Sequence, residues 1–194
     1  MGKVILGFTI SLDGFINDGN GSVERLYSNL DTLRYQAPLQ ESIKNTGAVV
    51  MGRKTYAMGD PDSYAGNYEY QVPIFVVTRT IPKKQPKQTE KLTFTFVTDG
   101  VESTIKRAKI AAGDKDVTIV GGADIATQCL NAGLVDEIHM DIMPVLFGNG
   151  LRPFENINEK VITLEKMSIF ESPVRTHLRF RVIKQAKGEV YEKR

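Results

Sequence analysis

The residues best suited to chemistry in this chain follow three short apolar runs. One run ends at Val120 and is followed by Gly121 and Gly122, after which the apolar spacing of residues 123–131 predicts a helix. Glycines allow a ligand to approach the backbone closely, and the N–H groups at a helix start favour an anion. A strand, a glycine pair and a helix can also serve only to pack that helix against a sheet. The pattern by itself therefore leaves two interpretations, a phosphate site and simple packing.

Two further runs end in cations and hydroxyl groups. The run Ala48–Met51 is followed by Gly52–Thr55, and the run Pro73–Val77 is followed by Thr78 and Arg79. Ligands gather at the carboxyl ends of strands in parallel α/β sheets, so three such ends can bind one extended molecule with several phosphates. This convergence favours ligand binding over packing alone.

The elements that must position these residues alternate between strand and helix. Apolar runs predict strands at 3–10, 48–51, 73–79, 94–97, 117–120 and 135–143, with helical spacing at 26–43, 101–112 and 123–131 and a break at Pro38. Residues 161–171 and 176–184 predict two antiparallel strands. This order predicts an α/β sandwich with a mostly parallel central sheet and antiparallel C-terminal strands. We expect a single domain over residues 1–184 and a polar tail at 185–194.

Composition excludes several classes of protein. The 194 residues are 41% hydrophobic and 25% charged, as in an ordinary globular domain. A net charge of +2, with basic residues scattered along the chain, argues against a nucleic-acid partner. No run reaches membrane-spanning length and no secretory signal is apparent, so we expect a cytoplasmic protein without a membrane partner. The single cysteine, Cys129, falls in the apolar pattern of a helix, where a small core residue is expected.

Together, these motifs resemble the dihydrofolate reductase fold. The paired segments are Val49–Tyr56 and Val120–Ile125. The loop Ser11–Ile16 and the segment Pro144–Gly150 resemble more closely one branch of that fold, the reductase domain of bifunctional riboflavin biosynthesis proteins and their stand-alone relatives. The resemblance spans roughly Lys3 to Lys184 and implies a three-layer sandwich.

The resemblance also implies NADPH as the cofactor. It places the adenosine phosphates beside Gly52, Arg53, Lys54 and Thr55, and the 2′-phosphate near Thr78 and Arg79. The pyrophosphate falls at Gly121, Gly122, Ala123, Asp124, Ile125 and Ala126. Arginine offers a planar, permanently charged fork that suits a phosphate dianion, which agrees with NADPH over NADH. A surface ion pair is the alternative for Arg53 and Arg79.

One position departs from folate reduction. Dihydrofolate reductases carry an acidic residue on the first helix that binds the pterin, and this position falls at or near Gln36. Glutamine cannot carry the charge that pairs with a protonated pterin. The resemblance therefore favours a ribosylamino-pyrimidine of riboflavin biosynthesis, or another small heterocycle or carbonyl compound, as the substrate. Dihydrofolate reductase activity and NADPH binding without turnover are the alternatives.

Two carboxylates are candidates for the catalytic role. Asp13 lies in the loop that the resemblance places over nicotinamide and substrate, and Asp141 lies in the alternating strand 135–143. A turn-stabilising role is the alternative for Asp13, and a structural hydrogen bond or a solvated position is the alternative for Asp141. Candidate substrate-binding residues are Ser11, Asp13, Gly14 and Gln36.

The resemblance further implies a homodimer, in which the apolar loop Val145–Phe154 takes part. An accompanying deaminase domain is not expected, since the chain has one cysteine and lacks a zinc-type His-x-Glu with a Pro-Cys-x-x-Cys partner. No metal site is predicted.

Overall fold

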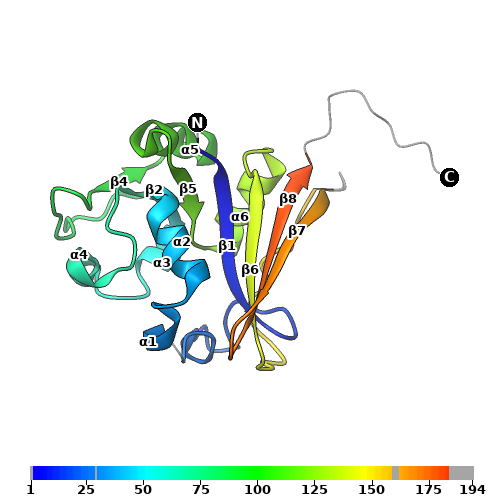
Figure 1. The fold of residues 1–194 in the computed structure, drawn as a ribbon. Helices are drawn as coiled ribbons and strands as arrows, with labels where there is room; N and C mark the ends of the chain where they lie inside the picture. The colour runs from blue at the N-terminus through cyan, green and yellow to red at the C-terminus, as the bar shows by residue number, and fades with distance from the viewer. Residues whose placement is uncertain (1, 29, 159–161, 184–194) are drawn as a thin grey trace.

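A computed structural model describes residues 2–28, 30–158 and 162–183, and the predicted polar tail at 185–194 lies outside these residues (Figure 1). Its strands form one sheet in the order β4-β3-β2-β5-β1-β6-β8-β7. Neighbours from β4 to β6 are parallel, whereas β8 runs antiparallel to both β6 and β7. The predicted sheet, mostly parallel with antiparallel C-terminal strands, is confirmed. The strands are β1 (Val4–Ser11), β2 (Thr46–Gly52), β3 (Ile74–Val77), β4 (Phe94–Val97), β5 (Asp116–Ile119), β6 (Glu137–Met143), β7 (Thr163–Glu171) and β8 (Thr176–Ile183).

Helices cover both faces of this sheet. On one face, α5 (Val101–Ala112) and α6 (Ala123–Asn131) pack against alternate residues of the central strands, such as Leu6 and Val50. On the other face, a second cluster around Val49 and Met51 packs beneath the chain between β2 and β4. The shorter helical elements are η1 (Glu24–Leu26), α1 (Leu30–Leu33), α2 (Ala37–Asn45), α3 (Arg53–Tyr56), η2 (Pro61–Ser63) and α4 (Tyr64–Asn67).

The helix boundaries follow local sequence signals. Proline fixes φ at a value suited to a first helical turn, and Pro38 occupies that place in α2, which accounts for the break predicted there. Gly100 and Gly113 flank α5 with positive φ angles of 95° and 64°. No helix in the described part of the chain is both long and apolar enough to cross a membrane.

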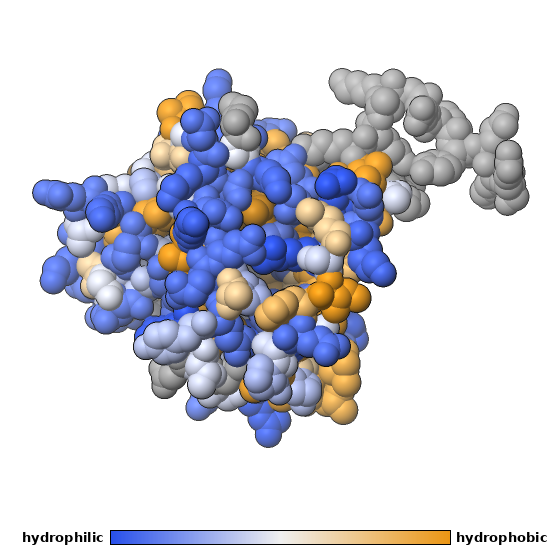
Figure 2. Space-filling model, viewed as in Figure 1, coloured by the Kyte–Doolittle hydropathy of each residue, from blue (hydrophilic) through white to orange (hydrophobic). Residues whose placement is uncertain are grey.

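The edge strand β7 leaves an apolar surface uncovered. Its side chains are exposed along almost the whole strand, and they include Ile169 at 55% and Phe170 at 47% exposure. Figure 2 shows hydrophobic surface on the side of the molecule where β7 and β8 lie. A monomer therefore presents one bare sheet edge with apolar character.

Candidate functional site

A cavity of about 360 Å³ lies between α2 and one face of the sheet. Three adjacent strands, β1, β6 and β8, supply much of its base. Helix α2 covers part of it through Pro38, Leu39 and Ser42. The segment 64–70 supplies the aromatic wall. The cavity thus combines an apolar, aromatic surface with a small number of ionisable groups, which is typical of small-molecule sites.

A carboxylate forms the polar floor. Asp141 on β6 lies directly opposite His177 on β8, and its Oδ1 is 2.6 Å from His177 Nδ1. Its Oδ2 accepts a hydrogen bond of 3.3 Å from Arg175 Nη1. The side chain of Asp141 is 27% exposed, whereas those of His177 and Arg175 are 4% and 0% exposed. Asp141 and His177 therefore both border the cavity, although His177 is largely buried, whereas Arg175 is buried outside the cavity wall.

The buried bases connect this floor to two other parts of the fold. His177 Nε2 lies 3.3 Å from Ser172 Oγ in the turn between β7 and β8, and that hydroxyl donates to the Arg175 carbonyl at 3.1 Å. Arg175 Nη2 donates to the Leu26 carbonyl at 3.2 Å, which joins the turn to η1. A side chain held by several hydrogen bonds has little conformational freedom left to lose. The orientation of Asp141 is therefore fixed before any ligand arrives.

Further along the same face of the sheet, the charged side chains form a series of ion pairs. His139 Nε2 lies 3.1 Å from Glu137 Oε2, and Lys3 Nζ lies 2.7 Å from the other oxygen of that carboxylate. Burial lowers the pKa of His139. Burial would raise the pKa of Glu137, but hydrogen bonds from Lys3 and His139 lower it overall. Arg179 Nη2 pairs with Glu41 of α2 at 2.7 Å, and this hydrogen bond lowers the pKa of Glu41.

Tyrosines supply the aromatic wall. Tyr64 and Tyr68 lie with their rings 5.0 Å apart and tilted by 63°, and Tyr70 follows at 5.7 Å from Tyr68. Tyr70 is also anchored to Ser42 of α2 by a hydrogen bond of 2.9 Å. Burial raises the pKa of Tyr64 to about 12 and that of Tyr68 well above its ordinary value. Together with Tyr27, these neutral rings offer flat surfaces to a planar ligand.

The glycine turn after β5 opens toward this cavity. Gly121 and Gly122 have φ angles of 134° and 86°, a region that disfavours residues with a Cβ. Gly52 N donates to the Gly121 carbonyl at 3.2 Å, so the ends of β2 and β5 are joined. A Cβ on Gly121 would lie 3.5 Å from Thr55 Oγ1. Thr55 and Val120 both line the cavity, which makes the turn and the cavity one continuous site.

The first turn of α6 offers its backbone to this site. No side chain caps the helix at Gly122. Asp124 is exposed and accepts a hydrogen bond of 2.9 Å from Gln128 Nε2, so its carboxylate is directed along the helix. The other side chains predicted to lie at the pyrophosphate are buried against the sheet: Ala123, Ile125 and Ala126. Ligand contacts in this turn would therefore come from backbone N–H groups.

The predicted cations lie at the same sheet edge but outside the cavity wall. Arg53 and Lys54 are exposed on α3, and Arg79 is exposed after β3, the neighbour of β2. Within the described residues, neither arginine forms an ion pair. Thr78 is 7% exposed, and its Oγ1 both donates to the Thr80 carbonyl at 2.8 Å and accepts from Thr80 N at 3.2 Å. The Thr78 hydroxyl is thus used within its own turn, which argues against its predicted role as a phosphate ligand.

The sequence matches the RibD C-terminal domain family over residues 2–178. The chain belongs to this family. The resemblance to riboflavin-type reductase domains is therefore confirmed at the level of the family.

Individual relatives of the RibD C-terminal domain family are distant. YyaP from Bacillus subtilis (strain 168), an uncharacterized protein, is 25% identical over 169 residues, which are 82% of this chain and 84% of that protein. A putative riboflavin biosynthesis protein from Shewanella sp. PV-4 has a TM-score of 0.76 with 21% identity, covering 94% of this chain and 99% of that one. A diaminohydroxyphosphoribosylaminopyrimidine deaminase/5-amino-6-(5-phosphoribosylamino)uracil reductase from Thermotoga maritima has a TM-score of 0.69 with 16% identity, covering 94% of this chain and 57% of that one. These structural likenesses confirm the predicted dihydrofolate reductase-like fold.

The geometry around Asp13 favours a structural role over the catalytic one that we expected. Its carboxylate accepts hydrogen bonds from Ser11 Oγ at 2.6 Å and from the backbone N–H groups of Phe147 and Gly148 at 3.1 and 2.7 Å. The Ser11 hydrogen bond, with help from the two backbone groups, lowers the pKa of Asp13 to about 2. Gly14 turns the loop with a φ of 89°, and none of Ser11, Asp13 and Gly14 lines the cavity. These residues join the first loop to the loop after β6.

Gln36 also lies beside the cavity instead of in its wall. It precedes α2, between the lining residues Leu33 and Pro38. Its Oε1 is buried and has no hydrogen-bond partner in the described part of the chain. The position where the resemblance places the folate-binding acid, at or near Gln36, thus carries a neutral side chain that is not among the residues lining the cavity.

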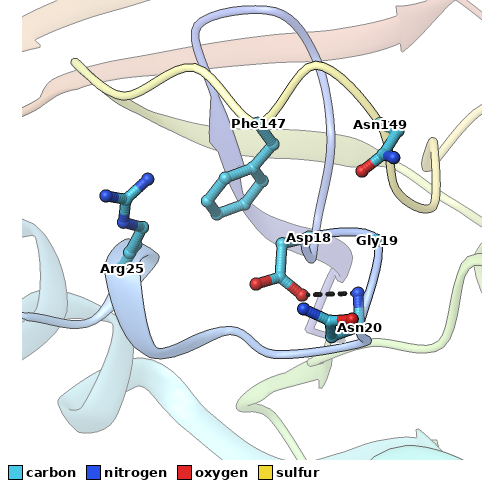
Figure 3. Close-up of a pocket in the computed structure, with 6 residues that line it drawn as sticks. All are labelled: Asp18, Gly19, Asn20, Arg25, Phe147 and Asn149. Carbon is cyan, nitrogen blue, oxygen red and sulfur yellow. Dashed lines mark hydrogen bonds between the residues drawn. The ribbon is translucent and has the colours of Figure 1, made fainter.

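A second, more open cavity of about 370 Å³ lies between the loop 17–22 and the loop after β6 (Figure 3). Asp18 organises the first loop by accepting hydrogen bonds of 2.9 Å from Asn20 N and Ser22 N. Figure 3 shows Phe147 between Arg25 and Asn149. The Asp18 carboxylate already accepts hydrogen bonds from the backbone of its own loop. This cavity therefore offers fewer reactive groups than the first.

Several residues of the site, three that line the cavity and Arg175 beside them, were not predicted from the sequence. His177 and Arg175 were assigned only to a C-terminal hairpin, and Tyr68 and Tyr70 lie between the predicted strands 48–51 and 73–79, where no element was predicted. A usable signal existed for His177. Antiparallel pairing of the last long strand with 135–143 places the odd-numbered residues of both strands opposite one another, on the same faces of the sheet, and His177 then lies opposite Asp141. No comparable signal pointed to the tyrosines.

Proposed function

We propose that this chain is an NADPH-dependent reductase that transfers hydride to a small heterocycle, a ribosylamino-pyrimidine of riboflavin biosynthesis or a related compound. The observation that carries the proposal is the continuity between the glycine turn and the cavity through Thr55 and Val120. A dinucleotide needs an anion site and an adjoining space for its reactive ring, and the glycine turn and the cavity are the parts of this fold that would supply them.

The residues present fit a phosphate-bearing cofactor. Gly121 and Gly122 have φ angles of 134° and 86°, which disfavour a side chain, and no side chain caps the start of α6. When bound, NADPH would supply the hydride from C4 of its nicotinamide. Gly121 and Gly122 would hold the pyrophosphate through backbone N–H groups, with Arg53, Lys54 and Arg79 available to the outer phosphates.

Asp141 and His177 are the proposed source of the proton that accompanies the hydride. Reduction of a ring or carbonyl requires a proton at the heteroatom, and a donor must reach it by a hydrogen bond. Asp141 borders the cavity and shares a short hydrogen bond with His177, so the pair can hold a proton at the cavity surface. The Asp13 carboxylate, in contrast, accepts hydrogen bonds from Ser11 Oγ and from two backbone N–H groups of the loop after β6, and it does not line the cavity.

Titration of NADPH into the purified protein tests the proposal directly. Gly121→Ala should weaken binding about tenfold, because it adds a Cβ at a φ of 134° within the proposed anion site. Gly59→Ala is the matched control, since no atom lies within 4 Å of its Cβ position and its φ is not positive. Absence of NADPH binding by a folded wild-type protein would refute the proposal.

A screen of NADPH oxidation against pyrimidine, pterin and carbonyl compounds separates the alternatives. Oxidation with a pyrimidine supports the proposal, and oxidation with dihydrofolate supports dihydrofolate reductase activity. Tight NADPH binding without oxidation by any compound would favour a binding protein without turnover.

A further inference from the structure

We infer that the cavity selects an unphosphorylated planar ring that presents N–H donors to Asp141. The inference rests on the proposed function and specifies the substrate class of the same site. It departs from the Thermotoga maritima relative, whose name specifies a phosphoribosylamino substrate. Two independent features of the cavity carry it: how its cations are used, and what its floor can accept.

The cations around the cavity are already neutralised. Of the lining residues that the structure describes, Arg179 alone carries a permanent positive charge, and it pairs with Glu41 at 2.7 Å. His139 pairs with Glu137, and burial lowers its pKa, which favours the neutral ring. A phosphate dianion is held in proteins by charged donors whose charge is available to it. Arg179 could act as such a donor only if its ion pair with Glu41 were broken.

The remaining charges near the floor are balanced in the same way. Arg175 is directed to Asp141, and Arg34 pairs with the lining residue Glu69 at 3.2 Å. The charged side chains that border the cavity itself therefore include two carboxylates, Asp141 and Glu69, against the single Arg179. A substrate phosphate would meet a surface with no surplus of positive charge.

The floor instead accepts hydrogen bonds. An ionised carboxylate has about four lone-pair sites, and the two basic partners of Asp141 use about two of them. Asp141 lines the cavity and its side chain is 27% exposed, so a ligand in the cavity can approach this carboxylate. Ring N–H or amino groups are suitable donors to these sites, and the tyrosine rings can stack on the same flat molecule.

Binding of matched probes tests this inference without requiring turnover. The first pair is 2,4-diaminopyrimidine and 2,4-dimethylpyrimidine, which have nearly the same shape but differ in donors. The second pair is cytidine and cytidine 5′-monophosphate. Dissociation constants are measured by ligand-observed NMR, with and without NADPH. The diamino compound should bind at least about tenfold tighter than the dimethyl compound, because hydrogen bonds to a charged group are worth about this much. Cytidine should bind at least as tightly as its phosphate.

Two variants give opposite expected changes. Asp141→Asn should reduce the preference for the diamino compound about tenfold. Glu41→Gln should release Arg179 and strengthen binding of cytidine 5′-monophosphate severalfold, while cytidine is unaffected. Glu165→Gln is the control, because Glu165 pairs with Arg181 at 2.6 Å on the exposed strand β7 and does not line the cavity.

Tighter binding of the phosphate by the wild type, equal binding of the two pyrimidines, or no binding of any probe would overturn the inference. The NADPH titration on the same samples keeps the two proposals apart. NADPH binding with a preference for phosphorylated probes would refute only the substrate class. The expected probe ranking without NADPH binding would refute only the reductase.

Discussion

Asp141 and His177 face each other across the β6–β8 ladder, with 2.6 Å between Asp141 Oδ1 and His177 Nδ1. The contact joins residues 36 positions apart and pairs a largely buried ring with a more exposed carboxylate at the cavity. It therefore serves two purposes, since it fixes the C-terminal hairpin to the parallel part of the sheet and it orients the acid of the site.

Replacement of His177 should cost stability as well as activity. In His177→Ala a half-buried carboxylate loses one of its two basic partners and a cavity forms, so we expect the free energy of unfolding to fall by about 2–4 kcal/mol. Urea denaturation measures this loss. The control is His139→Ala, since the partner Glu137 keeps Lys3 and the side chain of His139 is 23% exposed. Equal losses in the two variants would contradict the role given to His177.

The Asp13 carboxylate should behave as a pH-dependent link between two loops. Its pKa is lowered to about 2 in the folded protein, below the ordinary value of 3.8. A lowered folded pKa means that the stabilisation is present above pH 3.8 and is lost as the pH falls through about 2. The protection factors of the Phe147 and Gly148 amides, the two backbone donors, compare the measured exchange with the intrinsic exchange at the same pH. They should therefore be high at pH 5 and fall toward pH 2.

Asp13→Asn is the variant that tests this link. Its amides at 147 and 148 should exchange faster than those of the wild type at pH 5, and their protection factors should fall less on acidification. Asp18→Asn is a suitable control, because Asp18 accepts backbone hydrogen bonds within its own loop and not from the loop after β6. Unchanged protection in Asp13→Asn would show that the carboxylate does not hold the loops together.

Much of the fold could be predicted because its signals are local. The β-branched run before Gly121 and the alternation between Ile138 and Asp141 depend on neighbours within a few residues, and both strands formed as expected. The glycine turn was placed correctly beside Gly52 because parallel strands end at one edge of a sheet.

The parts of the site that were missed depend on distant pairings. His177 meets Asp141 only through the register of β6 and β8. Tyr27 belongs to the stretch 26–43 that was predicted to have helical spacing, but it lies between η1 and α1 and lines the cavity. The hydrogen-bond partner of a side chain within a turn also could not be predicted from the sequence. Thr78 is where it was expected, yet its hydroxyl hydrogen-bonds within the turn.

Arg79 should distinguish the two nicotinamide cofactors if it holds the 2′-phosphate. Arg79→Ala is expected to weaken NADPH binding about tenfold and to leave NADH binding unchanged, since only NADPH carries that group. Isothermal titration with both cofactors measures the difference. The control is Arg107→Ala, which removes another exposed arginine. Arg107 lies on α5 and pairs with Asp99 at 2.8 Å, and its replacement should change the affinity for neither cofactor. Equal losses for NADPH and NADH in Arg79→Ala would point away from the 2′-phosphate.

The loop after β6 should take part in a homodimer, which we propose from the resemblance and from its exposed apolar residues. Leu146 is 65% exposed and Leu151 is 42% exposed, on the loop that Asp13 holds in place. Leu146→Asp should shift the protein toward monomer in light scattering at micromolar concentration, because it places a charge in an apolar interface. Ile110→Asp is the control, since Ile110 is 75% exposed on α5 and lies outside this loop. A wild-type protein that is monomeric under these conditions, or a dimer disrupted equally by both substitutions, would contradict the proposed interface.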